Sequence, residues 1–231
     1  MQLNKREKLK TLVMEAYEKK ASHFDATRSK MATADFLWAT NKICANDQVL
    51  DLGCGNGRLL DYILVSPKNY LGIDNSSALL KIAKLKYPDF IFRKEDINDL
   101  KDLSPNKFSV IFCSAVMIHI PDRKNRIKIL SQLLATTQSN GLLIISAWKM
   151  TGNYYLKLKI KSIVKNFLLF RFKSWRDLVF PWKDQDGAPV CLRYYHYFSK
   201  RSFKKEILKA GWQIKEELDD RHNFWVVAVK K

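Results

Sequence analysis

The sequence has few cysteines and no C-x-x-C pair among them. Its four cysteines, Cys44, Cys54, Cys113 and Cys191, lie far apart in a chain of 231 residues. This spacing excludes a zinc ribbon and a dense disulfide framework, because both need several cysteines at short intervals. We therefore expect four small, buried thiols in a reducing compartment, and no metal site.

Long apolar runs are also lacking. No run approaches the roughly 18 residues that a membrane span needs, and the first twenty residues carry too many charges for the apolar part of a signal peptide. Hydrophobic residues nevertheless make up 47% of the chain, which is enough for a sizeable core. The sequence therefore predicts a compact cytoplasmic protein.

Acidic residues are scarce relative to basic ones. There are 23 Asp and Glu against 41 Lys and Arg, a formal net charge of +18. The excess is concentrated in residues 154–209, which hold fourteen basic residues and only four acidic ones. Such a balance favours a polyanionic partner, either nucleic acid or an anionic membrane surface. The alternative is a set of solvated lysines with no such partner.

Short apolar runs alternate with helical segments through the first two thirds of the chain. The runs that predict strands are 48–52, 69–74, 90–96, 108–116 and 141–148. The helical segments between them are 56–65, 76–87 and 122–137. Runs without inside/outside alternation are typical of strands buried on both faces, and their alternation with helices predicts a parallel sheet.

The remaining segments predict a cap, an insertion and a closing unit within one domain. Residues 5–40 have helical spacing, residues 150–198 break the rhythm, and a helix at 199–210 precedes two antiparallel strands at 212–218 and 223–231. The predicted parts of the single domain 1–231 are a helical cap (1–44), a cofactor-binding half (45–149), a substrate-side insertion (150–198) and a closing helix with strands (199–231). The predicted fold class is α/β, a doubly wound, mostly parallel seven-stranded Rossmann-like sheet with an antiparallel edge strand.

Three glycines at alternate positions follow the first predicted strand. In VLDLGCGNGR, Gly53, Gly55 and Gly57 allow a tight turn and a close approach to a ligand, at the opening of a predicted helix with free N–H groups. A dinucleotide enzyme normally has G-x-G-x-x-G, which cradles a pyrophosphate. The G-x-G-x-G spacing, with Asp51 before it, suits a cofactor that carries an ammonium and a carboxylate but no phosphate. The loop therefore predicts S-adenosylmethionine.

Acidic residues end the next two strands. Asp74 lies about twenty residues after Gly53, where a carboxylate can accept hydrogen bonds from both ribose hydroxyls; the alternative is a helix N-cap. Asp96 is placed to meet the adenine amino group, with Ile97 against the ring; the alternative for Asp96 is a surface turn. The expected cofactor-binding residues are Asp51, Gly53, Cys54, Gly55, Asp74, Asn75, Asp96, Ile97, Ser114 and Ala115. Over residues 45–148 these spacings resemble the class I methyltransferase fold.

Motifs outside this half carry a second resemblance. They are AV-x-x-H at 115–119, PW at 181–182, RYYH at 193–196, a C-terminal aromatic strand, and an opening Y-x-x-x-A-x-x-F-x-x-x-R from Tyr17 to Arg28 that includes His23 and Phe24. Together they resemble the tRNA wobble-uridine carboxymethyl methyltransferase family over nearly the whole chain. The segment 114–119 follows the fourth strand, where this fold places the reaction centre.

This resemblance implies methyl esterification of a carboxymethyl group on the wobble uridine, with the anticodon loop of a tRNA and a small zinc-ribbon activator as partners. A carboxylate is already ionised near pH 7 and needs no general base, so positioning is the main requirement. An arginine can hold its second oxygen while the first attacks. The candidate catalytic residues are Arg193, Arg28, His119, Tyr194 and His196. The candidate substrate-binding residues are Trp148, Trp182, Lys157, Lys161 and Lys165.

Two alternatives stay open. RYYH also fits a buried aromatic strand with one exposed arginine. A methyltransferase for a small or membrane-borne substrate, such as a quinone precursor, is favoured by the segment 156–168, whose apolar face and row of lysines resemble a helix that lies on anionic lipid. An apolar stripe of this kind more often packs into the protein core. A module that binds cofactor without catalysis would have a damaged glycine loop, and this loop is intact.

Overall fold

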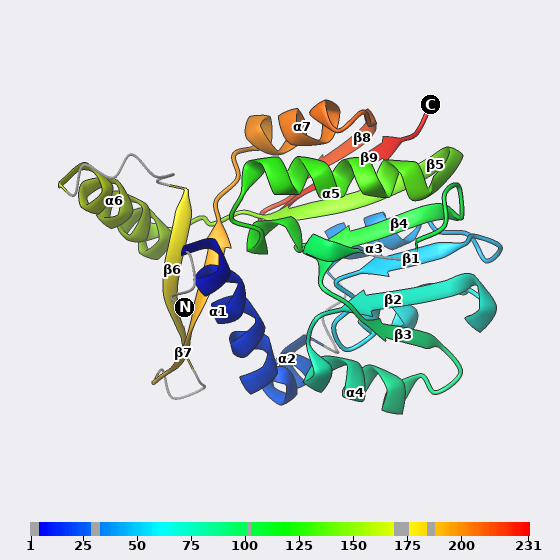
Figure 1. Cartoon of the computed structure of the whole chain (residues 1–231), viewed down its shortest axis with the longest axis horizontal. Helices are drawn as coiled ribbons and strands as arrows, with labels where there is room; N and C mark the ends of the chain where they lie inside the picture. Colours follow the sequence, from blue (N-terminus) through cyan, green and yellow to red (C-terminus); the bar gives the residue numbers. More distant parts are fainter. Residues whose placement is uncertain (1–4, 29–32, 101–102, 169–175, 184–187) are drawn as a thin grey trace.

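A seven-stranded sheet forms the centre of the molecule (Figure 1). The computed structural model describes residues 5–28, 33–100, 103–168, 176–183 and 188–231. The strands of the sheet are β1 (Val49–Leu52), β2 (Tyr70–Asp74), β3 (Ile91–Lys94), β4 (Phe108–Ser114), β5 (Thr137–Trp148), β8 (Gln213–Asp219) and β9 (Asn223–Val229). Their order is β3-β2-β1-β4-β5-β9-β8. Strands β1 to β5 pair in parallel, whereas β9 is antiparallel to both β5 and β8. The predicted sheet, with its antiparallel closing pair, is confirmed.

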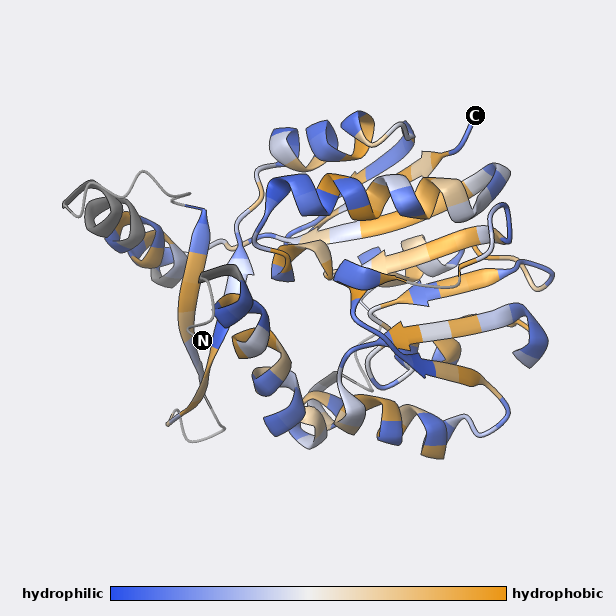
Figure 2. Ribbon diagram, in the orientation of Figure 1, coloured by the Kyte–Doolittle hydropathy of each residue, from blue (hydrophilic) through white to orange (hydrophobic). Residues whose placement is uncertain are grey.

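Helices cover both faces of this sheet. On one face α5 (Arg123–Thr136) lies beside α7 (Lys200–Lys209), on the other α3 (Ala34–Thr40) packs near β9, and α4 (Ser77–Lys86) flanks β3 (Figure 1). All four residues of β1 are buried, as expected for a strand covered on both sides. In Figure 2 the central strands are mostly hydrophobic, while the helices turn polar residues outward. The core therefore consists of two apolar layers, one on each face of the sheet.

The helix predicted over 56–65 is wrong. The structure has only a single 3-10 turn there, η1 (Arg58–Asp61), and Leu64 is 85% exposed. Gly57 immediately before the turn has a φ of 77°, so no helix can begin earlier, and Pro67 follows soon after. Within the turn only Leu59 is buried. So short a segment has too little buried area to offset the cost of starting an α-helix. The glycine loop therefore does not open an α-helix.

The N-terminal helices and the insertion lie beside the carboxyl ends of the parallel strands. Helices α1 (Lys5–Lys19) and α2 (Ala21–Arg28) run between α4 and a two-stranded hairpin of β6 (Asp177–Lys183) and β7 (Pro189–His196) (Figure 1). The insertion also contains α6 (Asn153–Leu168), which contacts β6. The helical cap and the break in rhythm at 150–198 are both found where the sequence predicts them, next to the edge at which β1 and β4 end.

Candidate active site

The glycine loop brings the ends of β1 and β4 close together. Gly53 has a φ of 75°, and its N–H donates to the Ile73 carbonyl at 2.7 Å. Ala115, just past β4, has a φ of 56°, a conformation that non-glycine residues seldom adopt outside functional or strongly constrained sites. A Cβ on Gly53 would lie 2.3 Å from Cγ2 of Val116. The two loops therefore form a narrow cradle that only a residue without a side chain can complete at this point.

Asp74 ends β2 at the same edge. Its Oδ2 accepts from the Gly55 N–H at 2.9 Å and its Oδ1 from the Ser76 N–H at 2.8 Å, and burial raises its pKa. A carboxylate offers about four acceptor positions, so this half-buried group keeps capacity for a further donor. The N-cap of α4 is Ser76, whose Oγ accepts from the Leu79 N–H at 3.2 Å. Asp74 is therefore free of that capping role, and it fits the ribose contact that the sequence predicts.

Asp51 lies underneath the loop. It is 4% exposed, and its Oδ2 accepts a hydrogen bond from the Tyr70 hydroxyl at 2.8 Å. Burial raises its pKa to about 7. This placement supports a role in holding the loop more than the direct cofactor contact that we predicted. Cys54, also predicted as a contact, is 5% exposed and points its sulfur toward Gly72.

Asp51→Asn is expected to remove a pH dependence of stability. The pKa of Asp51 is about 7 in the folded protein against an ordinary value of 3.8, so between these values the folded state holds a proton that the unfolded chain has released. The free energy of unfolding should therefore fall as pH rises through this window, by up to about 4 kcal/mol. Asparagine still accepts from Tyr70 but does not titrate. Urea unfolding at pH 5, 6 and 8 tests this, with the exposed Asp89→Asn as control; an unchanged slope in Asp51→Asn would contradict it.

Asp96 and Ile97 follow β3. Oδ1 of Asp96 accepts from the Asn98 N–H at 2.9 Å and from its side-chain amide, so Asp96 caps the 3-10 turn η3 (Ile97–Asp99). The local geometry is thus that of a turn, with the carboxyl group still half-buried, while Ile97 packs on the core. Ser114 is half-buried at the end of β4, with its Oγ 3.3 Å from Oγ of Ser146. These residues and Asn75, which is also half-buried, lie at the ends of neighbouring strands, as predicted.

The N-terminal helices are fastened to this edge at three points. Glu18 of α1 accepts the Ser77 and Ala78 N–H groups at the start of α4, the latter at 3.0 Å. Phe24 of α2 packs 3.6 Å from the position of a Cβ on Gly55. Asp25 accepts from the Asn56 side chain at 2.7 Å and pairs with Lys86. Helices α1 and α2 therefore form a cover over the glycine loop.

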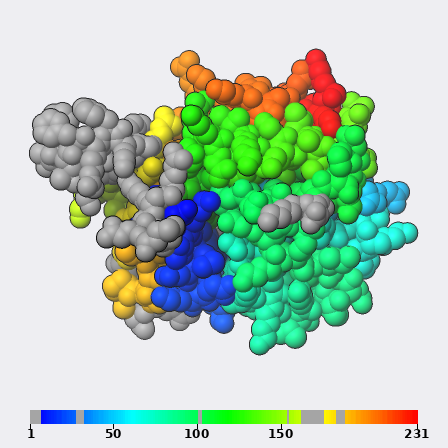
Figure 3. All heavy atoms as spheres, viewed as in Figure 1, coloured from blue at the N-terminus to red at the C-terminus, as the bar shows by residue number. Residues whose placement is uncertain are grey.

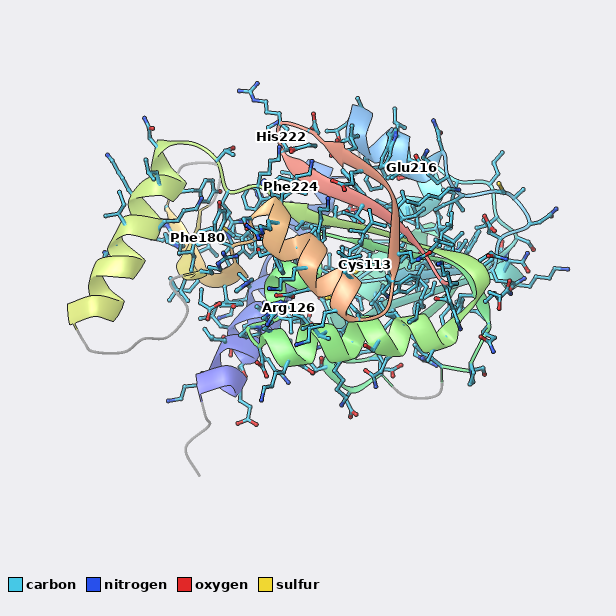
Figure 4. The ribbon with its side chains drawn as sticks, turned by 90° about the horizontal axis from the view of Figure 1, so that it is seen from above. Cys113, Arg126, Phe180, Glu216, His222 and Phe224 are labelled. Atoms are coloured by element: carbon cyan, nitrogen blue, oxygen red, sulfur yellow. The ribbon has the colours of Figure 1, made fainter. Side chains whose placement is uncertain are left out.

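Arg193 lies in an aromatic cluster next to this cover. We define the cluster as Tyr17, His119, Trp148, Phe180, Trp182 and Tyr195, whose rings contact one another edge to face. The Arg193 guanidinium lies 4.7 Å from the ring centre of Phe180, 5.0 Å from that of Trp182 and 5.2 Å from that of Tyr195. Figure 4 labels Phe180 on the hairpin, beside α6. Trp148 and Trp182, both predicted to bind substrate, belong to the cluster.

The charge of Arg193 is left without an acidic partner in the described part of the chain. Its Nε is buried and has no hydrogen-bond partner there, and its only hydrogen bond among those residues is a long one of 3.4 Å to the Tyr195 hydroxyl. A buried polar group with no partner is costly unless a ligand completes it. Arg193 is therefore the described cation best placed to receive an anion.

His119 is neutral in this site. Its Nε2 lies 3.0 Å from the Tyr17 hydroxyl and its Nδ1 3.4 Å from the Tyr194 carbonyl, which can only accept. Nδ1 therefore carries the hydrogen and Nε2 accepts from Tyr17. Burial lowers the pKa of His119 to about 4, and burial also holds the pKa of Tyr17 well above its ordinary value. Near neutral pH, these two neighbours of Arg193 are therefore both uncharged.

Tyr194 and His196 are not brought to Arg193. In a strand, successive side chains point to opposite faces, and these two point away from the cluster. Tyr194 donates to Asp177 at 2.6 Å, and His196 lies between Asp177 at 2.8 Å and Arg126 at 3.1 Å. Both are buried. This placement does not support the catalytic role predicted for them; it supports anchoring of the hairpin.

Arg126 is the residue that joins this anchor to the rest of the fold. Two of its nitrogens donate to the two carboxyl oxygens of Glu206, each at 2.8 Å, and a third donates to the Ile120 carbonyl at 2.7 Å. Figure 4 shows it on α5. We missed Arg126 in the sequence, although it precedes Ile129, Leu130 and Leu133 at helical spacing, which is a signal that it lies on the buried face of α5.

The remaining predicted residues are less informative. Lys157 and Lys161 are exposed on α6. Lys165 and Arg28 belong to α6 and α2, but their side chains lie outside the part that the structure describes. The residues that sequence reasoning missed in the site are Tyr195, Phe180 and Glu18. Tyr195 lies within RYYH, but the motif does not show which of its side chains face the site. No local motif marks Phe180 or Glu18, because each acts through a contact with a segment far away in the chain.

Gly53→Ala is expected to weaken cofactor binding by more than about ten-fold and to destabilise the protein, because its Cβ would collide with Val116 and its φ suits glycine. Gly152→Ala is a matched control, since Gly152 has a φ of 94° but nothing within 4 Å of an added Cβ. It should show the backbone strain alone. Calorimetric titration and thermal unfolding measure both effects. Gly53→Ala/Val116→Ala should recover part of the stability; equal behaviour of the Gly53 and Gly152 variants would contradict the cradle.

Comparison with known proteins identifies the type of enzyme to which this edge of the sheet belongs. Residues 49–141 match a family model described as a methyltransferase domain. The chain is a methyltransferase. The matched residues run from β1 into β5 and contain the glycine loop, Asp74 and the loop after β4. The fold is that of S-adenosylmethionine-dependent methyltransferases, so the class I resemblance is confirmed.

The chain is similar to two curated enzymes and to one solved structure, as follows. The methyltransferase is 28% identical over 240 residues to the tRNA (carboxymethyluridine(34)-5-O)-methyltransferase of Schizosaccharomyces pombe, covering 94% of this chain and 96% of that protein. It is 33% identical over 89 residues to the ubiquinone biosynthesis O-methyltransferase of Albidiferax ferrireducens, covering 36% of this chain and 35% of that protein. Among solved structures it is similar to the methyltransferase bound to the Trm112 activator of Haloferax volcanii, with a TM-score of 0.60, 13% identity, and coverage of 94% and 97%.

Proposed function

We propose that this methyltransferase esterifies the carboxymethyl group of a tRNA wobble uridine. The observation that carries the proposal is Arg193, a cation without a described acidic partner, in an aromatic cluster that includes His119 from the loop after β4. The guanidinium suits a carboxylate, and the rings suit a splayed base. The similarity to the fission yeast enzyme, which extends over nearly the whole chain, supports the same substrate.

The cofactor, S-adenosylmethionine, fits the donor set of the cradle and supplies a methyl group on a sulfonium. Gly53 allows the backbone to approach the cofactor, and Asp74 has acceptor capacity for a ribose hydroxyl. Asp96 and Ile97 would meet the adenine. These contacts orient the cofactor; they transfer no proton.

The residues of the cluster position the acceptor. Arg193 would hold one carboxylate oxygen while the other attacks the methyl carbon. A carbon–oxygen bond would form as the carbon–sulfur bond breaks, with the electron pair of the broken bond left on the sulfur. A carboxylate and a sulfonium thus become a neutral ester and a neutral thioether, and no proton moves. Because opposite charges are neutralised, exclusion of water by the aromatic rings favours the reaction.

Exposed lysines on α6 extend the proposal to the partners. Lys157 and Lys161 are exposed on α6, where they would meet phosphates of the anticodon stem or loop. A small zinc-ribbon activator is a further proposed partner, supported by the fold shared with the methyltransferase of the Haloferax volcanii complex. Within the described residues, no helix is long and apolar enough to cross a bilayer.

A second candidate is methylation of a phenolic quinone precursor. It is favoured by the similarity to ubiquinone biosynthesis O-methyltransferases, which covers about a third of the chain. A phenol must lose its proton to attack, so that reaction calls for a general base. His119, with a pKa of about 4, is a weak base for this purpose. The carboxylate acceptor agrees better with the charges of the site.

One assay separates the two. The enzyme is incubated with methyl-labelled cofactor and either tRNA from a strain that lacks this enzyme or a phenolic quinone precursor. We expect label in tRNA, found by nucleoside mass spectrometry as a single methyl that mild alkali removes, because esters hydrolyse and aryl ethers do not. Label only in the phenol, or alkali-stable label in tRNA, would contradict the proposal. A candidate activator is added in a parallel series to test whether turnover depends on it.

A further inference from the structure

A hollow of about 390 Å³ lies between α1, η3 and the start of α5. Its walls carry three lysines, Lys10 from α1 and Lys124 and Lys128 from α5, together with the side-chain amides of Asn98 and Asn125. In Figure 3 the blue atoms of α1 border the green atoms of this side of the sheet. None of these residues belongs to the cofactor cradle or to the aromatic cluster.

The three lysines have their charges available. Lys124 and Lys128 are exposed and one helical turn apart, so they share a face of α5, and Lys10 approaches from a different helix. No ion pair or side-chain hydrogen bond joins any of the three to another residue in the described ranges. The ammonium groups of these lysines come from two helices and converge on one hollow. Such a cluster suits a small anion such as a phosphate group.

The other polar groups of the hollow are consistent with a site for an anion. Asp122 accepts the N–H of Lys124 at 3.3 Å as the N-cap of α5, so its charge is directed at the helix. Glu7 is the second acid in the wall. Asn125 donates to Asn98, which in turn donates to Asp96, so both amides are held in place. Three cations against two acids leave the hollow positive.

The position of the hollow relates it to the reaction centre. Lys10 and Tyr17 are seven residues apart on α1, so they lie on one face of the helix and about 10 Å apart along its axis. Pro121, also in the wall, comes two residues after His119. A nucleotide whose base enters the aromatic cluster would therefore place neighbouring phosphates within reach of the hollow.

We propose that this hollow binds a backbone phosphate of the RNA substrate, next to the nucleotide that is methylated. The inference rests on the proposed function, and it adds a contact that fixes the register of the strand. Phosphate contacts position a nucleic acid without reading its sequence. The hollow would therefore contribute to affinity and placement for every tRNA that the enzyme modifies, and not to the choice among them.

The test compares two double variants that remove equal charge. Lys124→Ala/Lys128→Ala changes the hollow, and Lys81→Ala/Lys84→Ala changes two exposed lysines on α4. tRNA affinity is measured by fluorescence anisotropy between 50 and 200 mM salt, alongside KM and kcat for tRNA. We expect the hollow variant to lose at least about ten-fold in affinity and about one unit of the slope of log K against log salt, with KM raised and kcat unchanged. The α4 variant should stay close to wild type.

Cofactor affinity and melting temperature should be the same in both variants, because neither pair contacts the cradle or the core. A hollow variant that behaves like the α4 variant, while wild type methylates tRNA, overturns the inference and leaves the proposed function standing. Absence of tRNA methylation by the wild-type protein, with or without activator, overturns both. The reverse charge variant Lys124→Glu should lower affinity further; wild-type affinity in it would also contradict the inference.

Discussion

Arg193→Ala is expected to lower kcat about 100-fold or more on tRNA, with little change in cofactor affinity. The acceptor carboxylate needs no deprotonation, but it must be held about 3 Å from the methyl carbon in line with the breaking bond. Arg193 is the described cation placed for this, with three rings around it and with no hydrogen-bond partner for its Nε among the described residues. Alanine removes the cation and leaves the rings. Steady-state kinetics with tRNA, calorimetric cofactor titration and thermal unfolding measure the three quantities.

Arg193→Lys sharpens this test. Lysine keeps the positive charge but loses the planar donor pair and the stacking surface, so a loss of about ten-fold in kcat is expected. Arg201→Ala, at an exposed position on α7, is the matched control for removal of an arginine. Near-wild-type turnover in Arg193→Ala would exclude this residue from the site and leave Arg28 as the remaining candidate from the sequence.

Arg126→Met is expected to lower the free energy of unfolding by about 3–5 kcal/mol, because the buried Glu206 carboxylate loses both of its 2.8 Å hydrogen bonds from Arg126 and keeps only a 3.6 Å contact with the exposed Arg123. Arg126 is 1% exposed, and its donors also serve the Ile120 carbonyl and His196. Its loss therefore breaks the connection between α5, α7 and the hairpin at once. Urea unfolding at neutral pH measures the effect.

The double variant Arg126→Met/Glu206→Met is the control. Since it removes both charges, most of the lost stability should return. Glu206→Gln, which keeps an acceptor, gives an intermediate variant if Arg126→Met does not fold. A loss below about 1 kcal/mol in Arg126→Met would mean that water reaches the pair and that it behaves like a surface salt bridge.

The cofactor half of the site could be predicted because its signals are local. Asp74 ends β2, Gly53 comes directly after the buried strand β1, and Asp96 lies two residues after the edge strand β3. The ends of adjacent parallel strands meet at one edge whatever the rest of the chain does. The error at 56–65 arose from helical spacing alone. A sequence pattern records which residues are apolar, but it does not record that Gly57 and Pro67 leave the segment too short to bury them.

The substrate half could be predicted only in part. Tyr17 and His119 meet across 102 residues of sequence, and no local pattern pairs them. RYYH indicates the correct strand, but its four residues do not form one functional group, because side chains alternate in a strand. That alternation separates Arg193 and Tyr195, which face the cluster, from Tyr194 and His196, which anchor the hairpin.

Two consecutive residues of α1 connect the halves of the active site. Tyr17 contributes its ring to the aromatic cluster, and Glu18 caps α4 beside Asp74. One helix thus carries a contact to the cofactor cradle and a contact to the aromatic cluster, so a displacement of α1 would disturb both. On the proposed function, a single motion of α1 would therefore affect both donor exchange and acceptor entry. By thermodynamic linkage, the factor by which the bound donor raises the affinity for the acceptor equals the factor by which the bound acceptor raises the affinity for the donor.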